Sequence, residues 1–297
     1  MDNNSYQLDK SLVRASFDKA AQHYEEVAVL QREVGQRMMQ RLELIKIAPE
    51  RILDVGAGTG VQSNLLAERY PHAHITSLDL SANMLLQGRK NPSQPRQIVH
   101  VCGDAERLPF ANESLDLIFS NLTLQWCNNL DYAFFEFQRV LKPGGLLLFS
   151  TLGPDTLREL RNSWRSVDDY SHVNAFMDMH DIGDGLMRFL FADPVMDVEH
   201  ITLTYKDVYR LMKDLKSLGA HNVTAGRPAG LMTKSRLSAM QAAYEQYRQD
   251  GVLPASYEVI YGHAWKPDEN DTAIKKIPRR QQEVVTVSLS EIKRHHD

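Results

Sequence analysis

Apolar and polar residues follow two different spacings along this chain between residues 51 and 151. Short apolar runs predict five strands, over residues 52–55, 73–79, 98–102, 114–120 and 145–151. Between these runs, apolar residues at steps of three and four predict helices over residues 61–70, 81–89 and 130–141. Strands that alternate with helices form a parallel sheet covered on both faces. The pattern therefore predicts an α/β fold with a doubly wound, mostly parallel sheet.

The segments on either side of this region have other patterns. Residues 1–47 carry a helical spacing, which ends at Ala48-Pro49-Glu50. Beyond residue 151 we expect helices over 156–167, 181–191, 205–218 and 235–248, with strands over 195–204 and 257–265. We therefore divide the chain into a helical segment over 1–50, a main domain over 51–267 with an inserted helical cap at about 165–250, and a polar tail over 268–297. The tail's composition predicts partial disorder, with at most one edge strand over 284–289.

Three glycines follow the first predicted strand at alternate positions, in the sequence Asp54-Val-Gly56-Ala-Gly58-Thr-Gly60. Glycine lets the backbone approach a ligand closely because it has no Cβ. The carboxyl end of a parallel strand is also where open α/β sheets bind ligands. The spacing differs from the dinucleotide-binding fingerprint G-x-G-x-x-G, since Val61 stands where the last glycine is required. A glycine turn without a ligand is the simpler alternative.

This D-x-G-x-G-x-G pattern resembles the first motif of the Rossmann-like, class I methyltransferases, which use S-adenosylmethionine (SAM). In those enzymes the loop passes beside the methionine part and the ribose of the cofactor. The resemblance implies a SAM site whose loop residues are Asp54, Gly56, Ala57, Gly58 and Gly60. A helix that precedes such a domain can fold over the cofactor and exclude water, so we expect residues 1–50 to act as a lid.

Two acidic residues stand at the ends of the next two predicted strands. Asp79, followed by Leu80, ends the second strand, and a carboxylate there can accept hydrogen bonds from both ribose hydroxyls. Its alternative role is to cap the helix that starts near Ser81. Asp104, followed by Ala105, comes after the third strand, where methyltransferases of this class often place an acid against the adenine amino group. A turn-forming aspartate is the alternative there.

Other residues point to the methyl-transfer end of such a site. Asn121 and Leu122 follow the fourth strand, a position that faces the transferred methyl group in these folds. The Gln125-Trp126 pair could shape an acceptor pocket, although a buried tryptophan is as well explained by the core. Tyr24, on the leading helix with Phe17, could place an aromatic face near the sulfonium cation of SAM. The alternative for both rings is packing on the core.

Five further segments resemble one family more closely. They are Phe17–Tyr24, Asn121–Trp126, Thr151–Arg161, Leu218–Asn222 and Tyr261–Lys266. They are similar to the malonyl-acyl-carrier-protein O-methyltransferases of biotin synthesis, and the likeness spans about residues 14 to 267. The third and fourth segments are the most specific. A sister branch of mitochondrial complex I assembly factors has a similar Asp-Thr-Leu-x-Glu-Leu stretch, so a protein arginine hydroxylase-like or assembly-factor role is the alternative.

The resemblance implies methyl transfer from SAM to the free carboxylate of a malonyl thioester, on acyl-carrier protein or coenzyme A, with S-adenosylhomocysteine as product. A carboxylate is ionised at neutral pH, so alignment matters more than a strong base. An anionic acceptor needs a cationic partner, and Arg158 and Arg161 lie on one face of a predicted helix. Solvated arginines paired with Glu159 are the commoner arrangement. The candidate catalytic residues are Tyr24, Asn121, Arg158 and Arg161.

Bulk composition narrows the set of partners. The net charge of −4 over 297 residues gives no basic domain of the kind that binds nucleic acid. No apolar run is long enough to cross a membrane, and the first residues carry no signal peptide. We therefore expect a cytoplasmic protein, and a monomer. Cys102 and Cys127 are too few and too far apart for a zinc or redox motif, so we expect no metal.

An acyl-carrier protein is strongly acidic, so the resemblance also implies a basic docking surface. Candidates for this surface are Arg227, Lys234, Arg236 and the cluster at 275–280. Candidates in the cap for contact with the thioester arm or the carrier are Tyr205, Tyr209, Lys213 and Lys216. Scattered basic residues are usually only a solvated surface, which is the alternative here.

Overall fold

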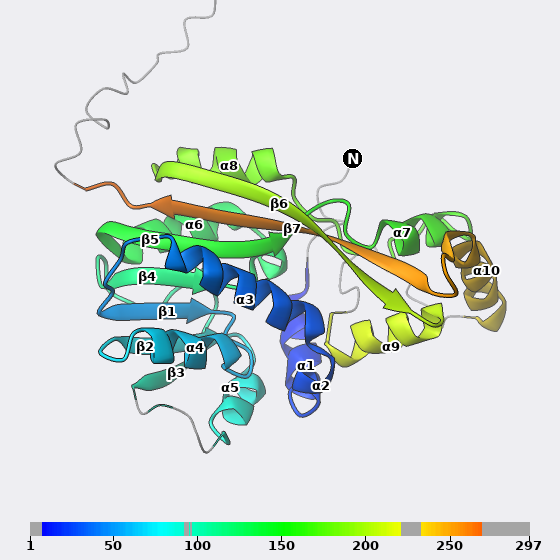
Figure 1. The fold of residues 1–297 in the computed structure, drawn as a ribbon, viewed down its shortest axis with the longest axis horizontal. Helices are drawn as coiled ribbons and strands as arrows, with labels where there is room; N and C mark the ends of the chain where they lie inside the picture. The colour runs from blue at the N-terminus through cyan, green and yellow to red at the C-terminus, as the bar shows by residue number, and fades with distance from the viewer. Residues whose placement is uncertain (1–7, 92–94, 96, 221–232, 269–297) are drawn as a thin grey trace, which may run out of the picture.

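The computed structural model describes residues 8–91, 95, 97–220 and 233–268. Its strands form one seven-stranded sheet in the order β3-β2-β1-β4-β5-β7-β6 (Figure 1). The strands are β1 (Arg51–Val55), β2 (His74–Asp79), β3 (Ile98–Cys102), β4 (Leu115–Ser120), β5 (Leu141–Leu152), β6 (Ala192–Tyr205) and β7 (Leu253–Trp265). The pairs among β1 to β5 are parallel, whereas β7 runs antiparallel to both β5 and β6. The predicted doubly wound, mostly parallel sheet is confirmed.

The helices of the described residues surround this sheet. They are α1 (Lys10–Ala20), α2 (Tyr24–Val27), α3 (Val29–Glu43), α4 (Val61–Arg69), α5 (Ala82–Gly88), α6 (Leu130–Val140), α7 (Arg158–Arg165), α8 (Met179–Arg188), α9 (Val208–Ser217) and α10 (Lys234–Tyr244). Two short 3-10 helices, η1 (Leu124–Trp126) and η2 (Glu245–Tyr247), complete the set. Ser81 caps the start of α5, since its Oγ accepts a hydrogen bond from Met84 N at 3.2 Å.

Helices cover both faces of the sheet because successive side chains of a strand point to opposite sides. In β1, Ile52 belongs to the core cluster that includes residues of α3 and α4. Its neighbour Leu53 belongs to the cluster that includes residues of α6 and α8. In β4, Leu117 and Ile118 divide in the same way, and all four side chains are fully buried. Strands buried on both faces explain why the sequence shows continuous apolar runs.

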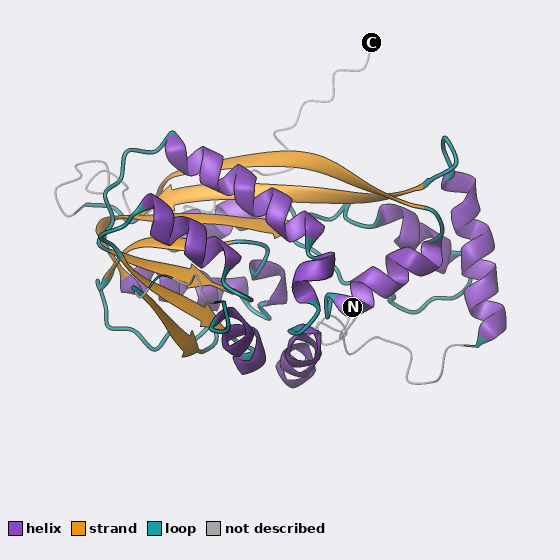
Figure 2. Cartoon of the chain, turned by 60° about the horizontal axis from the view of Figure 1, so that its bottom comes forward, coloured by secondary structure: helices purple, strands orange, loops and turns teal. Residues whose placement is uncertain are grey.

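The remaining helices gather beyond the parallel part of the sheet. Helices α7, α9 and α10 lie at the end to which the long β6–β7 ribbon extends (Figures 1 and 2). Helix α8 instead packs against α6 and β6. The range predicted as a helical cap, about 165–250, therefore contains both α8 and β6, the edge strand of the sheet. The division into lid, main domain and cap stays a prediction.

Two strands, β5 and β7, begin four residues earlier than their apolar runs predicted. β5 starts at Leu141, directly after α6, because Leu141 pairs with Leu115 across a register shift before the regular pairing resumes at Leu146. β7 starts at Leu253 because it pairs with β6 as far as Tyr205. Periodicity cannot detect such extensions, since the pairing comes from a distant strand. The predicted strand at 284–289 and nearly all of the polar tail lie outside the described residues.

A buried carboxylate joins α7 to β7. Glu159 is 3% exposed, and its two oxygens accept hydrogen bonds from Ser256 N at 3.1 Å and Ser256 Oγ at 2.5 Å. Burying a charged group is costly unless hydrogen bonds replace the lost water. These bonds fix the first turn of α7 next to Thr156 and Leu157, which line the cavity described below.

The β5–β7 pair depends on the absence of a side chain at Gly262. This residue pairs with Phe149, and a Cβ built on it would lie 2.3 Å from Phe149 Cζ. Phe149 is fully buried, so Gly262→Ala should lower the free energy of unfolding by about 1–3 kcal/mol. In the control Gly183→Ala, on α8, the new Cβ meets nothing within 4 Å, and helix propensity should raise stability by about 0.5–1 kcal/mol. Urea unfolding of both variants checks this, and equal shifts would contradict it.

Candidate functional site

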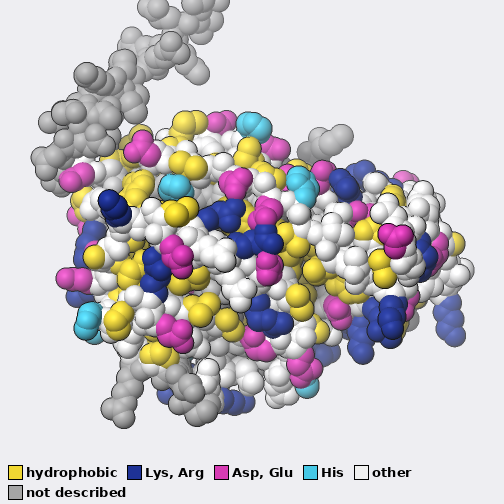
Figure 3. Space-filling view, in the orientation of Figure 1, with side chains coloured by type: hydrophobic (Ala, Val, Ile, Leu, Met, Phe, Trp, Pro, Cys, Tyr) yellow, Lys and Arg dark blue, Asp and Glu magenta, His cyan; other side chains and the backbone are white. Residues whose placement is uncertain are grey.

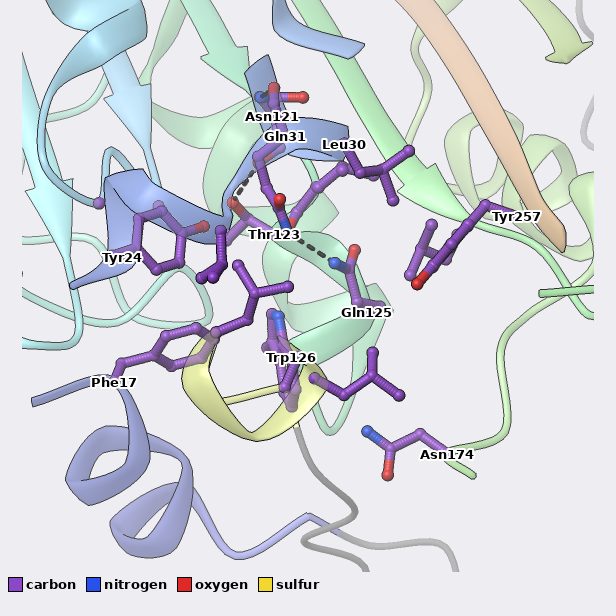
Figure 4. A pocket seen from close by; sticks show the side chains of 18 of the residues that line it. Phe17, Tyr24, Leu30, Gln31, Asn121, Thr123, Gln125, Trp126, Asn174 and Tyr257 are labelled. Atoms are coloured by element: carbon purple, nitrogen blue, oxygen red, sulfur yellow. Dashed lines mark hydrogen bonds between the residues drawn. The ribbon is translucent and has the colours of Figure 1, made fainter. Parts of the chain in front are cut away.

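The main cavity of the described residues lies at the carboxyl ends of β1 and β4, under α1 and α2. Figure 4 shows Phe17 and Tyr24 at one end, Asn174 and Tyr257 at the other, and Gln125 and Trp126 between them. The remaining lining residues are Val13, Val27, Leu30, Gln31, Gly56, Gly58, Asp79, Leu80, Met84, Asn121, Leu122, Thr123, Leu152, Thr156, Leu157, Phe176, Leu203, Tyr205, Asp214, Leu215, Leu218 and Ala220.

The glycine loop forms one wall of this cavity and adopts a conformation that needs glycine. Gly56, Gly58 and Gly60 have φ angles of 71°, 54° and 84°, in the left-handed region that other residues avoid. A Cβ built on Gly56 would also lie 2.0 Å from Thr123 Oγ1. The N–H groups of Gly56 and Ala57 donate to Leu78 O at 2.7 and 3.0 Å, so the loop is fixed to the end of β2.

Asp79 lies at the point where this loop meets β2. Its two carboxylate oxygens accept hydrogen bonds from Gly58 N and Ser81 N, each at 2.8 Å. Burial raises the pKa of Asp79 to about 6, against these hydrogen bonds, which lower it. Asp79 and Leu80 both line the cavity, so one carboxylate fixes the loop and the start of α5 and also borders the cavity.

Asp54 is placed more deeply than the sequence suggested. It is 1% exposed, and its Oδ2 accepts a hydrogen bond from Ser63 Oγ at 2.5 Å, which links β1 to α4. Burial raises the pKa of Asp54 to about 7. Asp54 lines a smaller cavity beside the glycine loop, together with Ala57, Gln31 and Gln62. Its predicted contact with the cofactor stays a prediction.

Two glutamines at this smaller cavity carry unpaired acceptors. Within the described part of the chain, the buried Oε1 atoms of Gln31 and Gln62 have no hydrogen-bond partner. A buried carbonyl oxygen without a donor is costly, so these atoms fit a ligand that brings N–H or O–H groups. The ammonium and hydroxyl groups of SAM are such donors. Sequence reasoning missed both residues, because a glutamine in a helix is normally solvent-exposed.

The end of β4 is held by polar contacts to two elements, α3 and β5. Asn121 Nδ2 donates to Gln31 O in α3 at 2.8 Å, and Asn121 Oδ1 accepts from Ser150 Oγ in β5 at 2.9 Å. Leu122 has a φ of 49° and donates through its N–H to Ser150 O at 3.1 Å. A leucine in the left-handed region is uncommon and marks a constrained turn. Both predicted residues line the cavity in a fixed orientation.

Helices α1 and α2 cover one side of the cavity. Tyr24 lines both the main and the smaller cavity, and burial together with the charge of Asp79 raises the pKa of its phenol. Phe17 packs edge-on against Trp126, with ring centroids 5.2 Å apart. Asp18 Oδ1 accepts from Ser81 Oγ at 2.6 Å, which ties α1 to α5. Helix α3 differs, since its buried face belongs to the core of the sheet.

Asp104 and Ala105 do not line the cavity. Lys10 Nζ of α1 lies 2.6 Å from each carboxylate oxygen of Asp104, and it also pairs with Glu106. Ala105 is buried in the core cluster beneath α6. The predicted contact of this acid with adenine stays a prediction, because in this structure the carboxylate is paired with Lys10 of α1.

The two candidate arginines also lie outside the main cavity. Arg158 is half-exposed, 3.8 Å from Asp155 and 3.5 Å from Glu159. Arg161 donates to Pro154 O at 2.6 Å and Thr156 O at 3.0 Å, and it borders a separate groove beside α7. Both arginines therefore have local partners in this structure. A role for either of them in substrate binding stays a prediction.

The docking candidates are only partly described. Arg236 pairs with Asp168, while Arg227 and the cluster at 275–280 lie outside the described residues. Of the cap candidates, Tyr205 lines the cavity and Tyr209 is exposed. On the face shown in Figure 3, basic and acidic side chains are intermingled. Ion pairs also join Arg37 to Glu199 and Arg41 to Asp197.

Sequence reasoning missed Thr123, Asn174 and Tyr257 as lining residues. Thr123 lies in a turn of the Asn121–Trp126 segment, whereas Asn174 and Tyr257 come from a loop and a strand that no motif marks. In the described ranges, no three His, Cys, Asp or Glu side chains are grouped so that they could hold a metal ion. No helix of those ranges combines the length and apolar character needed to span a bilayer.

Comparison with known proteins shows to which family this chain belongs. Residues 53–149 match the family model of the methyltransferase domain. A malonyl-[acyl-carrier protein] O-methyltransferase of Laribacter hongkongensis is 54% identical over 89% of this chain and 91% of its own length. One from Coxiella burnetii, named malonyl-[acyl-carrier protein] O-methyltransferase 1, is 42% identical over 100% of both chains. This chain belongs to the malonyl-[acyl-carrier protein] O-methyltransferase family. It is an enzyme, and its methyl donor is SAM.

Solved structures share the fold. A putative methyltransferase of Bacillus halodurans aligns with a TM-score of 0.57 and 22% identity, over 78% of this chain and 98% of its own. Phosphoethanolamine N-methyltransferase 2 of Haemonchus contortus, solved with SAM, aligns with a TM-score of 0.53 and 18% identity, over 84% of this chain and 57% of its own. At these identities the likeness concerns the fold alone, and it confirms the predicted class I methyltransferase architecture.

The pKa of Asp79 gives a test of its predicted contact with the ribose. Only the ionised carboxylate accepts hydrogen bonds on both oxygens, so the affinity for S-adenosylhomocysteine should fall as the pH drops through about 6. Below that pH the loss should approach roughly tenfold per pH unit. Asp79→Asn should weaken binding by at least about tenfold and abolish the transition. Calorimetric titration from acidic to neutral pH measures both effects.

The matched control is Asp104→Asn, which leaves Asp79 in place and should keep the transition. A transition that persists in Asp79→Asn would assign it to another group, with Asp54 as the first candidate, because burial raises the pKa of that group to about 7.

Proposed function

We propose that this enzyme transfers a methyl group from SAM to the free carboxylate of a malonyl thioester on acyl-carrier protein, an early step of biotin synthesis. The relatives carry the name of this reaction at 42–54% identity over most of the chain. The same relatives make a protein arginine hydroxylase-like or assembly-factor role the less favoured alternative.

The ionisable groups of the main cavity carry the proposal. Among its described lining residues there is no histidine, lysine or arginine, and the charged ones are Asp79 and Asp214. The phenols of Tyr24, Tyr205 and Tyr257 all have raised pKa values because they are buried, so they stay protonated. An amine or hydroxyl acceptor needs a base to remove its proton. A carboxylate is already ionised, so it suits a cavity without a strong base.

The chain's own residues then contribute position and exclusion of water. When bound, SAM supplies an electrophilic methyl group next to a sulfonium cation, and S-adenosylhomocysteine remains after transfer. The glycine loop, Asp79 and the two orphaned glutamines are placed to hold the cofactor. We propose that Tyr24 and Asn121 shape the methyl-transfer end, where α1 and α2 keep water from the acceptor. A carboxylate that has lost its water is more reactive toward a nearby electrophile.

The proposal extends to the finer predictions about partners. We propose that the acceptor is carried by acyl-carrier protein, and that malonyl-coenzyme A presents the same thioester. We also propose a cytoplasmic monomer that acts on neither nucleic acid nor membrane. Size-exclusion chromatography with light scattering tests the oligomeric state.

Incubation with methyl-labelled SAM and malonyl-carrier tests the reaction. Label should appear on the carrier as a methyl ester that mild base releases, since esters are cleaved by base. Acetyl-carrier is the matched control, because it has the same thioester and no free carboxylate, so it should take up no label. Absence of base-labile label on malonyl-carrier, or equal label on acetyl-carrier, would overturn the proposal.

A further inference from the structure

The main cavity is longer than a cofactor site requires. Past Trp126 it continues into a lobe between α9, the ends of β6 and β7, and the segment before α8. We call this part the far lobe, lined by Asn174, Phe176, Leu203, Tyr205, Asp214, Leu215, Leu218 and Tyr257. Figure 4 shows Asn174 and Tyr257 at the end of the cavity opposite Phe17 and Tyr24. The far lobe therefore has room for a molecule other than the cofactor.

Asn174 gives the far lobe an unpaired acceptor. Asn174 is 8% exposed, and its buried Oδ1 has no hydrogen-bond partner among the described residues. Leaving such an oxygen without a donor costs free energy, whereas an apolar side chain at the same place would cost nothing. The atom fits a ligand that brings an N–H or O–H group. A carboxylate brings neither, so it cannot satisfy this oxygen.

The other polar groups of the far lobe also favour an uncharged ligand. Tyr205 and Tyr257 are hydrogen-bonded to each other, and burial raises the pKa of Tyr205 to about 12, so both phenols remain neutral. Asp214 contributes a negative charge that repels an anion in this partly buried setting. The remaining walls are aliphatic or aromatic. The far lobe therefore suits an uncharged, flexible chain with amide groups.

Helix α9 separates the far lobe from a basic surface. Asp214 and Leu215 face the cavity, whereas Arg210, Lys213 and Lys216 of the same helix are exposed. The basic residues stand at steps of three, so they share the outer side of the helix. A basic outer face suits an acidic protein partner, and such a partner would sit one helix away from the far lobe.

We propose that the far lobe holds the pantetheine arm of the acyl carrier, with an arm amide donating to Asn174 Oδ1, and that the carrier docks on the basic face of α9. This inference rests on the proposed function, since the malonyl thioester of that reaction is the substrate that brings such an arm. The arm is uncharged, carries two amides and ends in the thioester. Its position in the far lobe directs the malonyl carboxylate away from Asp214 and toward the cofactor end.

Three malonyl thioesters separate the parts of this proposal. Malonyl-carrier has arm and protein, malonyl-pantetheine has the arm alone, and the malonyl thioester of 1-propanethiol has no amide. Asn174→Leu should lower kcat/KM for the first two by roughly 3- to 10-fold, the usual effect of one hydrogen bond, and leave the propyl thioester unchanged. An equal loss on all three, or no loss on any, would overturn the assignment of Asn174.

Charge reversal on α9 tests the docking face. Lys213→Glu combined with Lys216→Glu should raise KM for malonyl-carrier, by a factor that shrinks as salt increases, and leave malonyl-pantetheine unchanged. Lys46→Glu is the matched control, because Lys46 is exposed in the loop between α3 and β1, at the opposite end of the molecule from α9 (Figure 1). Equal effects of the control and the double variant would overturn the docking face.

Two measurements keep these outcomes interpretable. Asn174→Leu removes an unpaired buried group, so its Tm without ligands should be unchanged or higher; a lower Tm would indicate a structural role instead. Saturation-transfer NMR measures the binding of free pantetheine in the far lobe, and it requires no methyl transfer. Binding by the wild type that is lost in Asn174→Leu supports the lobe assignment even if no malonyl thioester is methylated, which would sink only the proposed function. Pantetheine that binds neither protein, or both alike, contradicts the lobe assignment.

Discussion

Hydrogen bonds join the ends of β1 and β2. Three backbone N–H groups of the glycine loop donate to acceptors at the end of β2. Gly56 and Ala57 donate to Leu78 O, and Gly58 donates to the carboxylate of Asp79. These bonds require left-handed backbone, which glycine supplies. They fix the loop, the start of α5 and the direction of Asp79 together. The cofactor end of the cavity therefore depends on this one connection between neighbouring parallel strands.

The other walls of the cavity come from elements that are far apart in the sequence. Asn121 joins β4 to α3 and β5, Tyr24 comes from α2, and Tyr257 comes from an antiparallel strand added to the sheet. Glu159 is buried against Ser256 and fixes the position of α7. The residues just before this helix line the cavity. Each contact satisfies polar groups that would otherwise be buried without partners, so the cavity has a defined shape before any ligand binds.

Charge is distributed unevenly along this cavity, and that distribution bears on its chemistry. Cationic side chains are absent from the described lining, while acids stand beside the glycine loop, as Asp79, and in the far lobe, as Asp214. Orphaned amide oxygens lie at both ends, on Gln31 and on Asn174. The acids and the unpaired oxygens suit a cationic cofactor and the amides of a carrier arm. The basic groups that an acidic carrier would meet lie outside, on α9.

The sequence alone determined the sheet, the glycine loop and the acids at the strand ends, because these follow from short-range periodicity and motif spacing. The order of the predicted strands was enough to place Asp79 and Asn121 at one edge, since parallel strands end on the same side. Leu141 and Leu253 were missed as strand residues because their pairing partners are remote.

Only the tertiary structure decided which side chains reach the ligand. It paired Asp104 with Lys10, gave Arg158 and Arg161 local partners, and brought Asn174 and Tyr257 to the cavity from segments without a motif. The physical reason is that a residue's type fixes what it can bind, whereas its neighbours in the fold decide whether that capacity is already satisfied.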